Sequence, residues 1–158
     1  MASANVSTIV KERPLNKDFQ MGMKQRCYVL DVTDSGYTGI AAADTHNLIP
    51  IPEGEALVGG VMIVETSFTS AGAATVTLQV ASDALSGDIP KANLAAGDVV
   101  RLNFAVSAAT ETKATYAKSA ADTLDWVVGT AALTAGKAIF LLDFVDAETL
   151  LDQGKIKW

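Results

Sequence analysis

The residue types that most often do chemistry are scarce in this chain, which has one histidine, His46, and one cysteine, Cys27. A zinc site needs several His, Cys or carboxylate ligands, and a catalytic triad needs a base beside its nucleophile. His46 lies between Thr45 and Asn47 beside an extended segment, so we expect a surface or capping histidine in a loop. Cys27 lies in an apolar run and is expected to be a buried thiol. These residues predict no catalytic group and no metal ligand.

Two short motifs approach known binding loops and match neither. The segment from Gly129 to Ala138 resembles a phosphate loop, but six residues separate its glycines where four are required. Ala138 also stands where that loop needs Ser or Thr. Asp31, Asp34 and Gly36 hint at a calcium loop, yet the further oxygen ligands and the distal Glu cannot be placed. We therefore predict ordinary turns at both places and no bound cofactor.

The acidic residues of the central loops do not form an evident catalytic pair. Asp83, Asp88 and Asp98 are scattered, whereas the two carboxylates of a glycoside hydrolase lie within about 10 Å of each other. Aromatic residues make up only 6% of the chain, which disfavours a sugar-stacking cleft. Trp126 alternates with apolar residues and is expected in the core. The sequence therefore favours a protein that is not an enzyme.

The elements that would position any site are β-strands. Apolar residues recur at every second position in several segments, and Gly, Pro and Asp turns separate them. A period of two places one set of side chains on a buried sheet face and the other set toward solvent. We therefore predict an all-β fold, a single jelly-roll-like β-sandwich of seven or eight strands. The predicted divisions are an extended N-terminal arm (1–26), the sandwich (27–147) and a C-terminal tail (148–158).

The alternation also predicts where the strands lie. Glu53 and Gly54 are expected to turn the chain into the longest strand, in which Gly59 and Gly60 indicate a bulge or a close backbone approach. Leu85 and Leu94 are expected to attach a polar loop to the core. Residues 45–51 are expected to be extended, with Pro50 and Pro52 excluding a central strand there. Residues 107–122 fit either a short helix or a loop. The predicted strands are 27–32, 56–68, 74–82, 98–106, 123–129 and 137–145.

The strand near residues 140–145 is apolar on both faces apart from Asp143. A sandwich in contact with solvent should have one polar face on each sheet. An apolar outer face indicates either a central position or a subunit interface, and the second fits a homotrimer. We therefore predict contact surfaces near Ile139 and Leu141.

Charge is unevenly distributed along the chain. Residues 1–26 hold five basic and two acidic residues, a net +3, so the remainder carries −9 of the total of −6. An acidic body argues against nucleic acid as the main partner. The basic arm could dock on an acidic protein surface, or it could be a solvated charged tail. Its candidate contact residues are Val6, Ile9, Val10, Lys11 and Arg13.

No membrane or export segment is evident. The longest apolar stretch, residues 56–64, is far shorter than the ~20 residues that span a bilayer. The N-terminus lacks a basic region followed by an apolar core, so no signal peptide is predicted. We expect a soluble protein made in a cytoplasm, with no membrane partner.

Several segments in order along the chain resemble a known group of proteins. They are residues 47–54 (NLIPIPEG), 61–66 (VMIVET), 68–78 (FTSAGAATVTL), 94–98 (LAAGD) and 133–138 (LTAGKA). Together they resemble small β-sandwich structural proteins of tailed bacteriophage virions, especially head decoration or cement proteins. The similarity covers roughly residues 27–147.

The resemblance implies a structural role on the virion. Such subunits assemble on the capsid surface, contact the major capsid protein and often form trimers, and they are made in the host cytoplasm. A tail, baseplate or fibre component with the same fold is one alternative. A carbohydrate-binding sandwich is another, and it would require exposed aromatic side chains to cluster: Tyr28, Tyr37, Tyr116 and Trp158.

Overall fold

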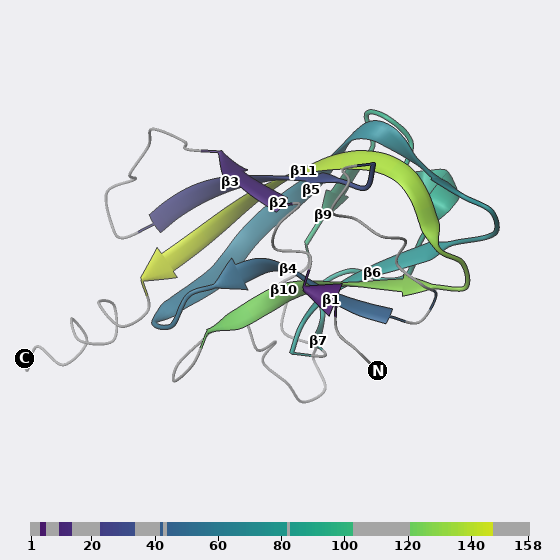
Figure 1. Cartoon of the computed structure of the whole chain (residues 1–158). Helices are drawn as coiled ribbons and strands as arrows, with labels where there is room; N and C mark the ends of the chain where they lie inside the picture. Colours follow the sequence, from purple (N-terminus) through teal and green to yellow (C-terminus); the bar gives the residue numbers. More distant parts are fainter. Residues whose placement is uncertain are drawn as a thin grey trace, which may run out of the picture.

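Two β-sheets pack face to face in the computed structural model, which describes residues 4–5, 10–13, 23–33, 42, 44–81, 83–102 and 121–146 (Figure 1). The first sheet, sheet A, has the order β1 (Ala4–Asn5), β4 (Asp44–Ile51), β10 (Asp122–Gly129), β6 (Thr75–Val80) and β7 (Asp83–Ala84), and β8 (Ile89–Pro90) also pairs with β6. The second, sheet B, has the order β2 (Val10–Arg13), β3 (Met23–Asp31), β11 (Leu133–Asp146), β5 (Glu55–Ser70) and β9 (Val99–Arg101). A short 3-10 helix, η1 (Lys91–Asn93), follows β8.

The strand order is that of a jelly roll. From β3 to β6 the chain alternates between the two sheets, and β10 and β11 then insert between the earlier strands. With β7 and β8 taken together as one edge strand, each sheet has four main strands, β3-β11-β5-β9 and β4-β10-β6-β7/β8. All their pairings are antiparallel. The predicted all-β sandwich of seven or eight strands is therefore confirmed.

The core lies between the sheets and follows the predicted alternation. Trp126, Phe140 and Phe144 are fully buried, and the rings of Phe68 and Trp126 are 5.5 Å apart. Such aromatic residues supply much of the apolar area that leaves water on folding. Leu85 and Leu94 are also fully buried, so the polar loop is attached to the core as predicted.

The longest strand, β5, contains the predicted bulge. Asp143 pairs with Gly59 and Phe144 pairs with Leu57, so Val58 is the extra residue. Before this strand, Gly54 has φ 82° in the turn that the Glu55 N–H closes by donating to the Pro52 carbonyl at 3.1 Å. A glycine adopts this left-handed conformation without steric cost, as the sequence predicted.

Residues 45–51 are extended as predicted, and they belong to β4, a strand paired with β10. It tolerates Pro50 because β1 pairs with β4 only at His46 and Asn47. Beside Pro50, the described residues place no strand on the other side of β4, so no ladder N–H is required there. His46 consequently lies in a strand opposite Trp126 and is 2% exposed, which corrects the expected surface loop.

Other boundaries differ from the prediction. The last strand begins at Leu133 rather than Lys137, because its first residues cross from one sheet to the other while still pairing with β5. Of the strand expected over 98–106, Val99–Arg101 is observed as β9, and residues 103–106 lie outside the described residues, as does most of the predicted 107–122 segment.

Part of the expected N-terminal arm belongs to the two sheets. β1 pairs in parallel with β4, and β2 pairs antiparallel with β3. Because β3 and β4 lie at corresponding edges of the two sheets, the arm extends both sheets on the same side of the sandwich. The tail predicted over 148–158 lies outside the described residues.

Candidate interaction surface

The outer face of sheet A is polar along its middle strands. Thr75, Thr77 and Gln79 alternate with buried valine and leucine on β6. Thr77 Oγ1 donates to an oxygen of Asp88 at 2.6 Å, which attaches the following loop to this face. This is the pattern of a sheet with one side in water.

The outer face of sheet B differs, because its middle is apolar across four strands. Tyr28, Phe140, Met62 and Val100 pair across the four strands and face the core. The residues just before and just after them on each strand face outward and form two rows. The first row is Val29, Ile139, Ile63 and Val99; the second is Cys27, Leu141, Val61 and Arg101. Seven of these eight side chains are apolar, so this is the face that departs from the rule of one polar side.

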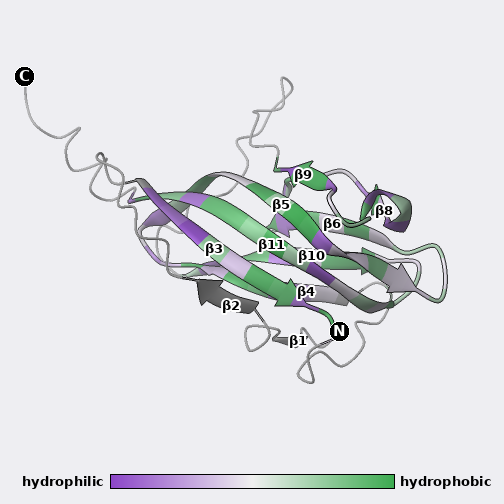
Figure 2. Cartoon of the chain, turned by 90° about the horizontal axis from the view of Figure 1, so that it is seen from above, coloured by the Kyte–Doolittle hydropathy of each residue, from purple (hydrophilic) through white to green (hydrophobic). Residues whose placement is uncertain are grey.

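Figure 2 looks down on sheet B and shows green along the middle of β11 and its neighbours, with purple mainly toward the strand ends. Polar residues occupy both ends of this face. At one end Lys137 lies beside Asp31 and forms a 3.1 Å ion pair with Glu65. At the other end Gln25 donates to Asp143 at 3.0 Å. We call the two apolar rows and these end residues the sheet B face.

The sheet B face includes two of the predicted contact residues. Ile139 and Leu141 are neighbours on β11, both partly exposed. Val10, Lys11 and Arg13 lie in the edge strand β2, whereas Val6 and Ile9 fall outside the described residues. Sequence reasoning missed the remaining members of the apolar rows. The one signal in the sequence was the run Val61-Met-Ile-Val64, whose consecutive apolar residues make both faces of that strand apolar.

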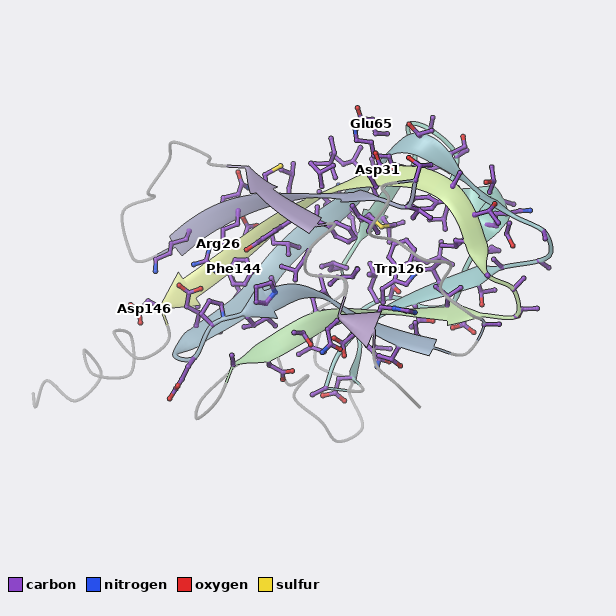
Figure 3. The ribbon with its side chains drawn as sticks, viewed as in Figure 1. Arg26, Asp31, Glu65, Trp126, Phe144 and Asp146 are labelled. Atoms are coloured by element: carbon purple, nitrogen blue, oxygen red, sulfur yellow. The ribbon has the colours of Figure 1, made fainter. Side chains whose placement is uncertain are left out.

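One open end of the sandwich is closed by a buried ion pair. The Arg26 guanidinium contacts both carboxylate oxygens of Glu55, at 2.8 and 2.7 Å, and lies 4.6 Å from the ring centre of Phe144 (Figure 3). Lys24 Nζ adds a third contact to Glu55 at 2.9 Å. Burial alone would lower the pKa of Arg26, but the hydrogen bond and charge of Glu55 outweigh it and raise that pKa. This cluster is structural, since each of its charges is paired with an opposite charge inside the cluster.

The residues whose types could do chemistry lie apart from one another. Cys27 is a buried free thiol on the sheet B face, as expected of a small apolar residue. Asp31 accepts hydrogen bonds from the Thr33 amide at 2.9 Å and hydroxyl at 2.5 Å, and Asp98 accepts one from the Ala95 amide at 2.8 Å. Asp34 and Gly36 lie outside the described residues.

Within the part of the chain that the structure describes, no three His, Cys, Asp or Glu residues lie close enough to hold a metal ion. A turn between two strands follows Gly129 as predicted, but it spans only residues 130–132, because β11 begins at Leu133. No helix among the described residues is long and apolar enough to cross a bilayer. Tyr28, one of the four aromatic residues that a sugar platform would need, is buried in the core.

Asp125, on β10 of sheet A, has a raised pKa. It is 9% exposed, and burial raises its pKa above the ordinary 3.8, with the charge of Asp122 adding to the effect. A hydrogen bond from Thr123 Oγ1 at 2.5 Å opposes the shift without cancelling it. The charged form of Asp125 is therefore disfavoured in the folded protein.

This shift predicts a pH-dependent effect of Asp125→Asn. Stability due to this group is lost as the pH rises from 3.8 through the raised folded pKa, because the unfolded state ionises first. The variant should gain up to about 1 kcal/mol over the wild type at neutral pH. The gain should disappear below the ordinary pKa of aspartate. Urea unfolding of both proteins over this pH range measures it, and a gain independent of pH would contradict the assignment.

The fold and its surfaces define a class, an all-β jelly-roll sandwich with one apolar outer face. No protein-family profile matches the chain, and no curated protein sequence matches it. A search of solved structures found a chain from the structure titled "Capsid of Ralstonia phage GP4", with a TM-score of 0.46 and 19% sequence identity, covering 84% of this chain and 91% of that chain. Similarity at this level is too low to establish a common fold or a common function.

Proposed function

We propose that this protein is a structural component of a tailed-phage virion that decorates or cements the capsid shell through protein–protein contacts. The observation that carries the proposal is the sheet B face, where apolar side chains of β5, β9 and β11 are partly or fully exposed although a solvated sheet would be polar there. The segments between Asn47 and Ala138 resemble virion decoration proteins in their order along the chain, and this resemblance indicates a capsid as the partner.

The proposed partners are the major capsid protein and copies of this chain, and the resemblance implies a homotrimer on the capsid surface. Two contact surfaces are available. The sheet B face contributes Ile139 and Leu141, and the N-terminal arm contributes the basic strand β2. Modest contacts suffice in this role, because binding to many lattice sites adds their strengths.

A binding assay with capsids tests the proposal. Capsids of the phage or prophage that encodes the chain, prepared without this protein, should bind the purified protein saturably and sediment with it. Leu141→Asp should weaken that binding about tenfold or more, since it places a charge in an apolar contact. Gln79→Lys, on the polar outer face of sheet A, is the matched control and should bind like the wild type. Absence of saturable binding by the wild type would refute the proposal.

A further inference from the structure

The charges of the sheet B face follow the pattern of a surface that matches itself. Along its central strand β11, the outward positions read Lys137, Ile139, Leu141 and Asp143. A positive residue thus lies at one end, a negative residue at the other, and two apolar residues lie between them. The centre of this series is Phe140, which is level with Tyr28, Met62 and Val100 on the neighbouring strands.

We propose that the sheet B face binds the same face of a second copy of this chain, around a twofold axis that lies in the interface across the strands at the level of Phe140. This rotation reverses the strand direction and exchanges the two apolar rows. Ile139 of one copy then faces Leu141 of the other. Such a contact is isologous, so every pairing occurs twice.

The charges fit this partner. The rotation brings Lys137 of each copy opposite Asp143 of the other copy, because both residues lie three positions from Phe140. The lateral order of strands is preserved, so β3 lies over β3 and β5 over β5. Glu65 then faces Gly59, beside which the Asp143 carboxylate lies, and Asp31 faces Gln25, an amide that can donate to it. Lys137 then lies between Glu65 of its own chain and Asp143 of the other copy, so its charge offsets both carboxylates.

The size of the face indicates a weak pair. Strands about 4.8 Å apart and a rise of about 3.4 Å per residue outline a patch of roughly 20 Å by 20 Å between Lys137 and Asp143. That is smaller than the ~800 Å² per partner of a standard stable complex. We therefore expect a dissociation constant of about 10 μM to about 1 mM. Packing of two sheets within about 30° of alignment keeps the charged ends within reach of each other's side chains.

Charge exchange tests the pairing in the full chain. Sedimentation equilibrium of the protein without capsids, between about 10 μM and about 1 mM, should show a monomer–dimer equilibrium for the wild type, since the homotrimer is proposed only on the capsid surface. Lys137→Asp and Asp143→Lys should each weaken the dimer about tenfold, because each places two like-charged pairs in the contact. The double variant should recover most of that loss. Exchange cannot restore the intrachain Lys137–Glu65 pair, so recovery reports contact between copies. Gln79→Lys should leave the dimer unchanged.

A second measurement does not depend on variants. On dilution of the wild type, amide NMR signals of the apolar rows in β3, β5, β9 and β11 should shift, and those of β6 and β10 should not. A wild type that stays monomeric to about 1 mM overturns the pairing, as does an oligomer insensitive to the charge variants or shifts confined to sheet A.

The pairing relies on the proposed function only in treating the sheet B face as a protein contact. The two ideas fail separately. Capsid binding by a protein that never pairs would refute the pairing and leave the virion role. Pairs that respond to charge exchange, in a protein that does not bind capsids, would leave the pairing and refute that role.

Discussion

Replacing Gly136 by alanine is expected to lower the free energy of unfolding by about 3 kcal/mol. Gly136 has φ 137°, which L side chains rarely adopt, and an added Cβ would lie 2.3 Å from Cδ1 and 2.8 Å from Cα of Phe68. Part of this obstacle is backbone, so a side-chain rotation cannot remove it. The residue also fixes the path of β11, since its carbonyl accepts a hydrogen bond from the Val32 N–H at 2.9 Å.

Substitutions at two other glycines separate the cost of backbone strain from the cost of the close contact with Phe68. At Gly97 φ is 95° but nothing lies within 4 Å of the added Cβ, so alanine should cost only the backbone strain, about 1 kcal/mol. Gly87 has open space and no such φ, and its substitution should change stability by less than about 0.5 kcal/mol. In urea unfolding, the loss of stability should be much larger for the Gly136 variant than for the Gly97 variant, and larger for the Gly97 variant than for the Gly87 variant. Equal costs at Gly136 and Gly97 would contradict the close contact with Phe68.

Replacing Glu55 by alanine is expected to cost about 3 kcal/mol, because it leaves the partly buried Arg26 without its bidentate partner. Lys24 would lose the same partner. The matched control is Glu65→Ala, which breaks the exposed pair with Lys137 and should cost less than about 1 kcal/mol.

A double substitution distinguishes an unpaired charge from lost packing. Arg26→Met with Glu55→Leu removes both charges while keeping apolar volume against Phe144, and it should recover much of the loss seen for Glu55→Ala. Chemical unfolding of the four proteins completes the comparison. A Glu55→Ala variant as stable as the wild type would show that the pair does not close this end of the sandwich.

The sequence was sufficient for the architecture because burial imposes a strict period of two on strands. The alternation around Val76, Leu78 and Trp126 predicted the core, and Gly54 and Gly59 predicted a turn and a bulge that the structure contains. The apolar character of the last strand on both faces also led directly to Ile139 and Leu141.

The errors arose where partner strands decide the outcome. Pro50 disfavours a central strand, and β4 does have an open side at that residue, but sequence does not reveal that the segment pairs with β10. The burial of His46 follows from the same pairing. The Arg26–Glu55 pair joins residues far apart in the chain, and its one local signal was that Arg26 shares the parity of the buried residues Tyr28 and Leu30.

The sheet B face was only partly predictable for a similar reason. Ile139 and Leu141 stand out within their own strand, whereas Val29, Ile63 and Val99 become one surface only when four strands align. Register between distant strands is set by the whole sandwich and is not written in any single segment.

The most direct test of the virion role is quantitative mass spectrometry of purified virions from the phage or induced prophage that encodes the chain. A capsid decoration or cement protein should be present in a number of copies comparable to that of the major capsid protein, and should remain with the heads when tails are removed. A protein that is abundant in the infected-cell lysate but absent from purified particles would contradict that role.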